Sequence, residues 1–272
     1  MNALLVVNHF LNTNKFNELH NHLVCAAKNC DIDLKIKTNL ELAAQDADAD
    51  FVLFWDKDIN LARRLEKNGI PVFNSSKAIA LCDDKAKTYI ELDGIVKQPK
   101  TLIAPKCYFR VDMGAFVDSA IEILGLPLVF KECFGSFGEQ VHLCKNRDEI
   151  MVHISERPFI LQEFIKESAG TDVRLEIVDG KCVSAAKREN KSDFRSNVTN
   201  GGTMYAYSPT KEEIDIASAA CNALGLTFGG VDILNNNMVC EVNSNAHIIN
   251  IMKSNGIDIA PVIFNAIMEK IK

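Results

Sequence analysis

Over residues 1–75, short apolar runs alternate with segments whose apolar residues recur at helical spacing. The runs have the length of β-strands and read ALLVVNHF, DLKIKT, DFVLFWD and IPVFN. The segments between them each present one apolar helical face and read KFNELHNHLVCAAKNC, ELAAQDA and INLARRLEKNG. This alternation of strand and helix predicts a small parallel α/β sheet.

The middle of the chain mixes both element types around a glycine-containing turn. The pattern predicts one helix that begins after Ser75 or Ser76, as its N-cap, and ends at Gly94. A second helix is predicted over 112–124. The remaining elements are a short helix, RDEIMVHI, the turn ECFGSFGEQ, and the strands KQPKTLI, LPLVFK, VHLCK and RPFILQEFI.

From about residue 171 the pattern changes to strand–turn–strand units. The segment DVRLEIVDGKCVSAAKRE has Asp-Gly as its hairpin signal, and GGVDILNNNMVCEVN contains a second hairpin. Helices are predicted for KEEIDIASAACNALG and PVIFNAIMEKI. The predicted fold class is therefore α/β in the first part and α+β, rich in antiparallel pairs, in the last part.

The second hairpin carries acidic residues within apolar strand sequence. A two-residue turn at 236–237 suits asparagine, which tolerates positive φ. In that register Asn235 pairs with Met238 and Asp232 pairs with Glu241, so the two carboxylates share a face. Directly opposed like charges destabilise a hairpin unless a cation intervenes.

Asn243 shares the strand face of Glu241, because side chains two residues apart point the same way. With Asp232, these side chains offer carboxylate and amide oxygens, which are the donors that Mg²⁺ and Mn²⁺ prefer. The spacing alone leaves two alternatives open: a metal site, or a solvated sheet edge on which the carboxylates need no partner.

Composition and charge narrow the class of protein. The chain has 272 residues, 47% of them hydrophobic, and 30 Lys and Arg against 36 Asp and Glu give a net charge of −6. Because no basic stripe or tail is visible, no nucleic-acid partner is expected. No apolar run reaches the roughly 18 residues of a membrane span. The first residues also lack the pattern of a signal peptide, so no membrane partner is expected.

Nine cysteines are scattered along the chain and form no CxxC pair. This usage is typical of buried, reduced thiols and predicts a cytoplasmic protein. Nothing in the sequence pairs one of them with a histidine, so a catalytic cysteine is not supported.

Lys131 ends a predicted buried strand, just before a loop that contains Gly135, Ser136 and Gly138. A glycine loop can bring backbone N–H groups against phosphate, and a nearby lysine supplies positive charge. The loop matches no standard phosphate motif, so an ordinary hairpin turn is the alternative.

The segment KREN…DFRSN…GG places Lys187, Arg188, Arg195 and Asn197 in a loop closed by two glycines. Exposed charge clusters are usually solvated faces. Because this one lies where secondary-structure signals are weak, the pattern favours a binding loop.

Lys85 and His247 have simple interpretations when each is taken alone. Lys85 follows two aspartates at a helical position, as an exposed lysine beside acidic first-turn residues would. His247 lies shortly after the hairpin, and a single histidine is most often a local hydrogen-bonding residue. We assign it no catalytic role from the sequence.

Together these segments resemble the ATP-grasp superfamily and, within it, the RimK-like carboxylate–amine ligases. The similar segments occur in the family's order over about residues 72–260, and residues before them resemble the small α/β domain that precedes an ATP-grasp fold. The resemblance implies domains at 1–82, 83–160, with the glycine loop, and 161–272, with the metal site. The segments read FNSSKAIALCDDKAKT, LVFKECFGSFGEQV, LQEFIKESAGTDVR, DFRSNVTNGG, GGVDIL, CEVNSN and NGIDIA.

The resemblance implies a role for residues along a nucleotide cleft. Lys85 and Lys131 match lysines that contact the phosphates of ATP, residues 162–165 match the hinge that holds adenine, and Asp172 matches the acid on the ribose side. The expected nucleotide-binding set is Lys85, Lys131, Ser136, Gln162, Glu163, Phe164, Ile165, Asp172 and Lys187.

The same resemblance implies which residues lie where the phosphate is transferred. Arg195 matches an arginine that faces the transferred phosphate, and Arg174 and Arg188 are further candidates for that region. The implied ligands of Mg²⁺, for which Mn²⁺ can substitute, are Asp232, Glu241 and Asn243.

The implied activity is an ATP- and Mg²⁺-dependent ligation of a carboxylate to an amine through an acyl phosphate. In the RimK pattern, glutamate or another amino acid is added to a peptide, protein or small-molecule acceptor. Relatives often form dimers or tetramers, so a homo-oligomer is compatible with the resemblance. The alternative function is a non-catalytic nucleotide-binding module that regulates a partner.

Two departures from the family pattern lie where an acceptor would be recognised. After the expected metal ligands, relatives commonly carry a small-Pro-Gly run, but this chain has the residues Ser244-Asn245-Ala246-His247. In the glycine loop, Gly138 is followed by Glu139-Gln140 before the valine. Neither change removes a phosphate or metal ligand, and both leave the identity of the acceptor open.

Overall fold

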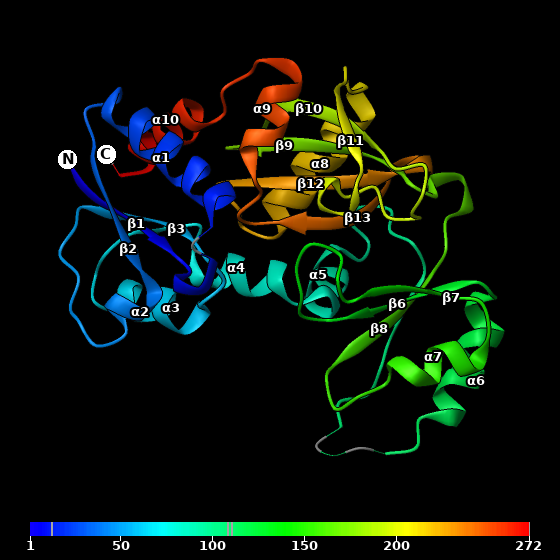
Figure 1. Ribbon diagram of the computed structural model, residues 1–272. Helices are drawn as coiled ribbons and strands as arrows, with labels where there is room; N and C mark the ends of the chain where they lie inside the picture. The colour runs from blue at the N-terminus through cyan, green and yellow to red at the C-terminus, as the bar shows by residue number, and fades with distance from the viewer. Residues whose placement is uncertain (12, 108, 110, 272) are drawn as a thin grey trace.

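Three β-sheets organise the described part of the chain, which is every residue except 12, 108, 110 and 272 of the computed structural model (Figure 1). The strands are β1 (Asn2–Val7), β2 (Asp33–Thr38), β3 (Phe51–Trp55), β4 (Val72–Phe73), β5 (Thr101–Ile103), β6 (Leu128–Glu132), β7 (Val141–Cys144), β8 (Phe159–Glu163), β9 (Thr171–Val178), β10 (Lys181–Glu189), β11 (Thr203–Ala206), β12 (Phe228–Leu234) and β13 (Met238–Asn243). The first sheet is parallel, in the order β2-β1-β3-β4. Two antiparallel sheets follow, in the orders β5-β8-β6-β7 and β11-β10-β9-β12-β13.

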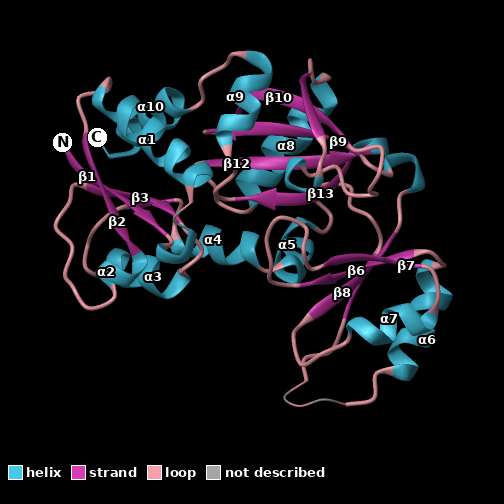
Figure 2. Ribbon diagram, viewed as in Figure 1, coloured by secondary structure: helices cyan, strands magenta, loops and turns pink. Residues whose placement is uncertain are grey.

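Helices cover the faces of these sheets (Figure 2). They are α1 (Asn14–Lys28), α2 (Asn39–Leu42), α3 (Ile59–Lys67), α4 (Ser76–Asp83), α5 (Lys85–Leu92), α6 (Gly114–Leu124), α7 (Arg147–His153), α8 (Lys211–Ala223), α9 (Ile248–Asn255) and α10 (Ala260–Ile271). The predicted fold class, a parallel α/β sheet followed by antiparallel sheets, is confirmed. The division at residues 82 and 160 stays a prediction.

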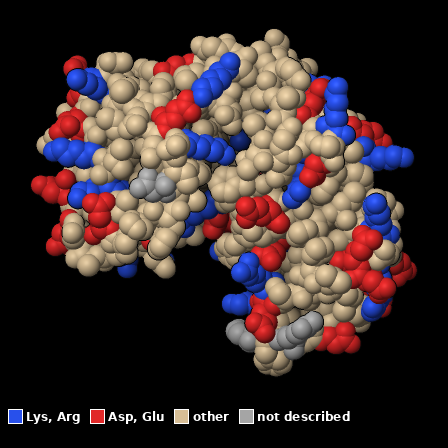
Figure 3. Space-filling model, in the orientation of Figure 1, with Lys and Arg blue, Asp and Glu red and all other residues tan. Residues whose placement is uncertain are grey.

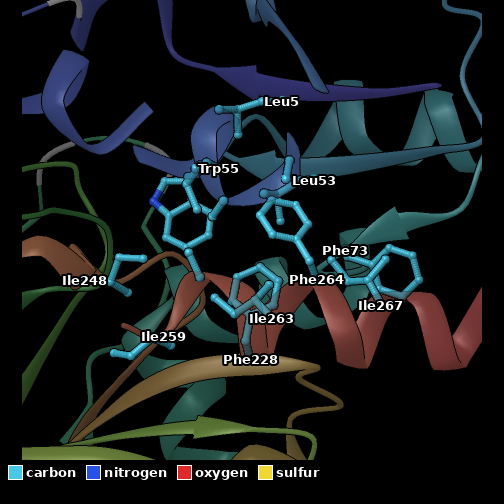
Figure 4. Packing of buried hydrophobic residues seen from close by; sticks show 14 of the residues in the cluster. Leu5, Leu53, Trp55, Phe73, Phe228, Ile248, Ile259, Ile263, Phe264 and Ile267 are labelled. Atoms are coloured by element: carbon cyan, nitrogen blue, oxygen red, sulfur yellow. The ribbon is translucent and has the colours of Figure 1, made fainter. Parts of the chain in front are cut away.

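The core of the first sheet is completed by the other end of the chain. Helix α10 lies beside α1 over the face of β1 and β3 (Figure 1). Phe264 and Ile263 of α10 are almost fully buried there, and Trp55 at the end of β3 stacks on Phe228 of β12 at 5.2 Å (Figure 4). Burial of a large apolar side chain stabilises by about 1.5–3 kcal/mol. The cluster therefore fixes β3 and β12 relative to each other.

Further cores attach the remaining helices. On the other face of the first sheet, α3 and α4 pack through Leu61, Leu65 and Ile79. Helix α8 packs on the β9–β13 sheet through Ala217 and Ala220. Helices α6 and α7 pack on the β5–β8 sheet in the same way. Each sheet is thus rigid enough to present side chains at a defined edge.

The single helix predicted up to Gly94 is wrong, because it is two helices that meet at Asp84. Asp84 has an extended backbone, with φ −100° and ψ 105°, and its carboxylate accepts the N–H groups of Ala86 and Lys87 as the N-cap of α5. The break places Lys85 at the first position of a new helix. Of the two predicted caps, Ser75 is the N-cap of α4.

The predicted hairpin register is correct at the acidic pair and wrong at the turn. Asp232 pairs with Glu241, as expected, but Leu234 and not Asn235 pairs with Met238. The turn contains three residues, 235–237, and a bulge between Asp232 and Ile233 restores the register. The longer turn and the bulge offset each other, so the two carboxylates still face one another.

The pattern missed two elements and overextended a third. Strand β11 pairs with β10 directly after the segment expected to be a binding loop, and α9 follows the second hairpin. The first residues of that expected loop, Lys187 and Arg188, belong to β10. The helix predicted for ELAAQDA is limited to the short α2. No helix of the described residues has the length and apolar character needed to cross a membrane.

Candidate active site

A cavity of about 120 Å³ lies between the two antiparallel sheets, and most of the predicted nucleotide-binding residues line it. We call it the lysine cavity, after Lys85 and Lys131. Ends of β6, β8, β9, β10, β12 and β13 meet there. Besides these lysines, the predicted residues that line it are Ser136, Gln162, Glu163, Phe164, Ile165, Asp172, Arg188, Arg195, Asp232 and Glu241.

The two lysines approach the acidic hairpin from different sheets. Lys131 of β6 is 7% exposed, and its Nζ lies 3.5 Å from the Sγ of Cys240. Lys85 Nζ lies 3.7 Å from Oε1 of Glu241. Burial opposes ionisation of Glu241, but the charges of Lys85 and Lys131 outweigh it and hold the pKa of this carboxyl below its usual value. Glu241 is therefore an anion near neutral pH.

Asp232 is held by two arginines of the neighbouring strands. Arg174 Nε and Nη2 donate to its two oxygens at 2.6 and 2.7 Å, and Arg188 Nη2 lies 2.9 Å from Oδ2. Arg188 also donates to Asp172 at 2.7 and 2.5 Å. Although burial opposes ionisation, the two guanidinium groups hold the pKa of Asp232 below its usual value. Partner side chains thus compensate one of the two opposed carboxylates.

The predicted metal ligands fit a divalent cation in their chemistry. Oδ1 of Asp232 accepts one hydrogen bond, so it keeps a free lone pair, and Glu241 has only a long contact with Lys85. The Nδ2 of Asn243 is buried without a partner, so turning this amide to present its oxygen costs no hydrogen bond. Mg²⁺ takes such oxygens and fills its remaining positions with phosphate and water.

The described residues contain no group of three or more His, Cys, Asp or Glu side chains placed to hold a metal. The predicted set is consistent with this finding, because it has two carboxylates and an amide. Such a set binds a cation through one or two carboxylates together with a nucleotide rather than in a closed protein cage.

The predicted adenine hinge follows β8 along one wall of the lysine cavity. Gln162 is fixed by its Nε2, which donates to Thr101 Oγ1 at 2.8 Å, and Glu163 accepts the N–H of Lys100 at 2.6 Å. Phe164 meets Phe194 edge-on, with ring centroids 6.2 Å apart. The side chains at 162 and 163 are held by neighbours, which leaves backbone groups and an aromatic wall to face a base.

The glycine loop at 133–140 is closed against three other parts of the chain. Arg195 Nη1 donates to the carbonyl of Gly138 at 2.5 Å, and Lys57 Nζ donates to that of Gly135 at 3.4 Å. Phe137 meets Phe16 of α1 at 6.1 Å. Positive φ values of 61° at Phe137 and 74° at Gly138 let the loop fold back. The loop thus lies over the lysine cavity as a lid.

Lys187 is the predicted site residue that the structure does not bring to the cavities. Its side chain lies on the opposite strand face from Arg188 and forms a 2.6 Å ion pair with Glu189. Its assignment to nucleotide binding is a prediction that this geometry does not support. Sequence reasoning also missed several lining residues: Phe194, Ser196 and Cys240.

A second cavity of about 430 Å³ lies between the first sheet, the lid and the hairpin. We call it the interlobe cavity. Four residues line both cavities: Ser136, Arg188, Asn197 and Glu241. Arg174 and Asn243 line the interlobe cavity alone. On the face drawn in Figure 3, the surface is notched between the first sheet and the β6–β8 region, with charges of both signs along the notch.

The N-terminal wall of the interlobe cavity was not predicted. It includes Asn8 after β1, Asp56 and Lys57 after β3, and Lys15 and Phe16 at the start of α1. The aspartate that follows DFVLFW was visible in the sequence as the end of a strand. Its approach to the hairpin depends on how the sheets pack, which no local pattern encodes.

Two antiparallel sheets that enclose lysines, a glycine lid and an acidic hairpin, behind a parallel α/β sheet, define the class of ATP-grasp proteins. The family model described as "RimK-like ATP-grasp domain" matches residues 65–267. The chain belongs to this family and is an ATP-grasp ligase.

Individual proteins agree with this assignment. The chain is 34% identical to "Probable alpha-L-glutamate ligase" of Maridesulfovibrio salexigens, over 74% of this chain and 68% of that protein. It is 32% identical to "Uncharacterized protein MG012" of Mycoplasma genitalium, over 82% and 84%. The fold is similar to that of D-alanine–D-alanine ligase from Bacillus anthracis complexed with ATP, with a TM-score of 0.77 and 18% identity over 100% and 97% of the chains.

Proposed function

We propose that this chain forms an amide bond between a carboxylate and an amine, with ATP hydrolysed to ADP and phosphate and with Mg²⁺ bound at the hairpin. The observation that carries the proposal is the convergence of Lys85, Lys131 and Glu241 where the two cavities meet. One cavity has the groups to hold a triphosphate, and the other has room for the reacting acid and amine.

In the proposed first step, a substrate carboxylate oxygen attacks the γ-phosphorus of ATP. The bond between that phosphorus and the β–γ bridging oxygen breaks, which gives ADP and an acyl phosphate. Lys85 and Lys131 neutralise phosphate oxygens, and Arg195 faces the transferred group from the lid side. Mg²⁺ bound by Asp232, Glu241 and Asn243 would supply further positive charge at the β- and γ-phosphates.

In the second step, the amine attacks the acyl carbon as the neutral species, after its ammonium form has lost one proton to solvent. The C–N bond forms, the bond to phosphate breaks, and the nitrogen loses a second proton. Water would compete with the amine, so the lid that Arg195 and Lys57 hold closed has a function in both steps. Arg174 and Arg188, which are already fixed by Asp232 and Asp172, would orient the carboxylate or stabilise the tetrahedral oxyanion.

We propose an amino acid as the amine, with glutamate the first candidate because the relative in Maridesulfovibrio salexigens is named a probable alpha-L-glutamate ligase. The acceptor class covers peptides, proteins and small acids. A cytoplasmic location is supported by the nine cysteines, all described and all free thiols. A homo-oligomer is part of the same proposal, and neither nucleic acid nor membrane is part of it.

The test is a screen of ATP, Mg²⁺ and pairs of amino acids with carboxylic acids, followed by phosphate release and by the mass of the product. We expect at least one pair to release phosphate and to give a product that is one water lighter than the sum of its reactants. Replacement Glu241→Ala should reduce turnover by at least about a hundredfold. The control is Glu189→Ala, in the same sheet but outside both cavities.

Two results would count against the proposal. Unchanged turnover in the Glu241→Ala variant would reject the metal assignment. Tight ATP binding without phosphate release for any pair would instead favour the non-catalytic regulatory module.

A further inference from the structure

The carboxyl ends of β1 and β3 form the floor of the interlobe cavity. In the order β2-β1-β3-β4, the chain runs from β1 outward to β2 and then crosses to β3 on the other side. The crevice outside such a reversal, between β1 and β3, is where open parallel sheets bind ligands. Asn8 follows β1 and Asp56 follows β3, so both lie at this point.

Asp56 is fixed at this crevice through one of its two oxygens. Oδ1 accepts the side-chain N–H of Asn8 at 3.1 Å and the backbone N–H of Lys57 at 2.7 Å. Oδ2 is buried and has no hydrogen-bond partner among the described residues. Trp55, which precedes Asp56, is stacked on Phe228 and packed near Ile248 (Figure 4). The strand end is therefore held in place while one carboxylate oxygen stays unpaired.

No described cation compensates Asp56. The residue is 4% exposed, and none of the ion pairs among the described residues includes it. Its neighbour Lys57 pairs with Asp83 at 2.8 Å instead. Burial raises the pKa of Asp56 above its usual value. A buried carboxylate without a charged partner costs free energy, which a bound cation would recover.

A second unpaired acceptor belongs to His247, another residue that lines the interlobe cavity. His247 Nε2 is 3.3 Å from the carbonyl oxygen of Lys15, which can only accept, so Nε2 carries the proton. Burial lowers the pKa of His247, so the ring is neutral near pH 7 and its Nδ1 is an acceptor. That Nδ1 is buried and unpaired. It belongs to the run Ser244–His247, where the chain departs from its family's pattern.

Most of the unpaired atoms belong to residues of one cavity. Five buried side-chain atoms lack a partner in the described residues, and three of them belong to residues that line the interlobe cavity: Asp56 Oδ2, Asn243 Nδ2 and His247 Nδ1. Each such atom costs about 1–3 kcal/mol when left unpaired. Two of the three are acceptors, so a ligand with N–H donors and a positive charge fits them.

We propose that Asp56 binds the ammonium group of the amine substrate in the interlobe cavity and that His247 accepts a further hydrogen bond from the same ligand. The inference rests on the proposed ligase function and adds the amine site, which it places on the first sheet. The amine is then held in the interlobe cavity. Glu241 and Arg188 line both this cavity and the lysine cavity, where the nucleotide binds. The chemical class is a primary ammonium compound.

The first experiment measures binding and needs no turnover. The wild-type protein, with Mg²⁺ and the non-hydrolysable analogue AMPPNP, is titrated calorimetrically with each proteinogenic L-amino acid and with its analogue that lacks the amino group. We expect at least one amino acid to bind at least about tenfold more tightly than its des-amino analogue. Failure of every amino acid to bind would overturn the inference.

The second experiment compares Asp56→Asn with Asp58→Asn. Both changes remove one negative charge, but Asp58 caps α3, a task that asparagine also performs, and does not line the cavity. Asp56→Asn should weaken the selected amino acid by about tenfold to a hundredfold, with AMPPNP affinity unchanged, and Asp58→Asn should bind like the wild type.

Retained amino-acid affinity in Asp56→Asn would overturn the assignment even if ligation is observed. A selective loss of amino-acid binding, together with no phosphate release from ATP under any condition, would instead preserve the amine site and reject the proposed ligase function. The two failures are thus distinguishable. His247→Ala should give a smaller loss than Asp56→Asn, because it removes a neutral acceptor.

Discussion

The antiparallel β9–β13 sheet and the parallel β1–β4 sheet each bury one aspartate beside a cavity, and the two aspartates have opposite surroundings. Asp232 is 3% exposed and meets Arg174 and Arg188 within 2.9 Å. Asp56 is 4% exposed and forms no ion pair with the described residues. The first charge is balanced within the fold, whereas the second is balanced only when a cation arrives. Asp232 and its arginines thus belong to a preformed site for anions, whereas Asp56 belongs to a site for a cationic ligand.

The largest effect should follow from removing one of the balancing arginines. Arg188→Met removes the cationic partner of Asp172 and one of the two cations at Asp232. Asp172 then keeps only the hydroxyl of Ser196 as a side-chain donor among the described residues. The change should lower the free energy of unfolding by about 3–5 kcal/mol. Denaturant titration measures the loss. The control Lys187→Met changes the adjacent, half-exposed lysine and should stay within about 0.5 kcal/mol. Equal losses of stability in the two variants would show that Arg188 does not balance the charges of Asp172 and Asp232.

A double-mutant cycle should give the next largest value. Arg188→Met and Asp232→Asn should be coupled by about 1–3 kcal/mol, because each variant removes the partner of the other. The exposed pair Arg147–Asp118 has a shorter contact, 2.6 Å against 2.9 Å in the buried pair, and should still be coupled by less than about 1 kcal/mol. A coupling below about 1 kcal/mol between Arg188 and Asp232 would show that Asp232 does not depend on Arg188.

Replacement of Asp56 should change the free energy of unfolding in the opposite direction. Asp56→Asn removes an uncompensated buried charge and keeps an acceptor for Asn8, so without ligand it should raise the free energy of unfolding by about 0.5–2 kcal/mol. Urea titration of the free protein is the measurement. A loss of stability would mean that the fold itself uses the charge.

The smallest effect should be the change with pH in the contributions of Asp232 and Asp56 to the free energy of unfolding. The pKa of Asp232 is lowered, so its contribution to stability is present above its unfolded value, near 3.9, and is lost as pH falls through the folded value. The pKa of Asp56 is raised, so its charge destabilises above the folded value and that penalty disappears in acid. Between about pH 7 and pH 4, the gain from Asp56→Asn should shrink. A gain independent of pH would exclude charge as its cause.

Regular elements and the acidic hairpin were within reach of sequence reasoning because their signals are local. The pairing of Asp232 with Glu241 was predicted from a two-residue turn and is confirmed, because the longer turn and the bulge offset each other. The break at Asp84 was missed because apolar spacing continues through it, while its cap depends on backbone geometry. Strand β11 has few residues, and it exists because β10 offers an edge to pair with.

The electrostatics of the site could not be predicted from the sequence. Spacing left open whether a metal or solvent balances the hairpin acids, and the arginines that hold Asp232 come from β9 and β10. Alternation along β9 and β10 makes Arg174 and Arg188 available, but only strand order brings them to β12. Prediction of the position of Asp56 would need more information than strand order, because Asp56 reaches the cavity through the packing of separate sheets.

The packing of α10 on the first sheet has a consequence for synthesis of the protein. Residues 2–55 leave the ribosome well before Ile263 and Phe264, which close their core, are translated. Until then the part of this core that α10 covers stays open to chaperones and proteases. Closure of this core therefore requires that residue 264 has left the ribosome.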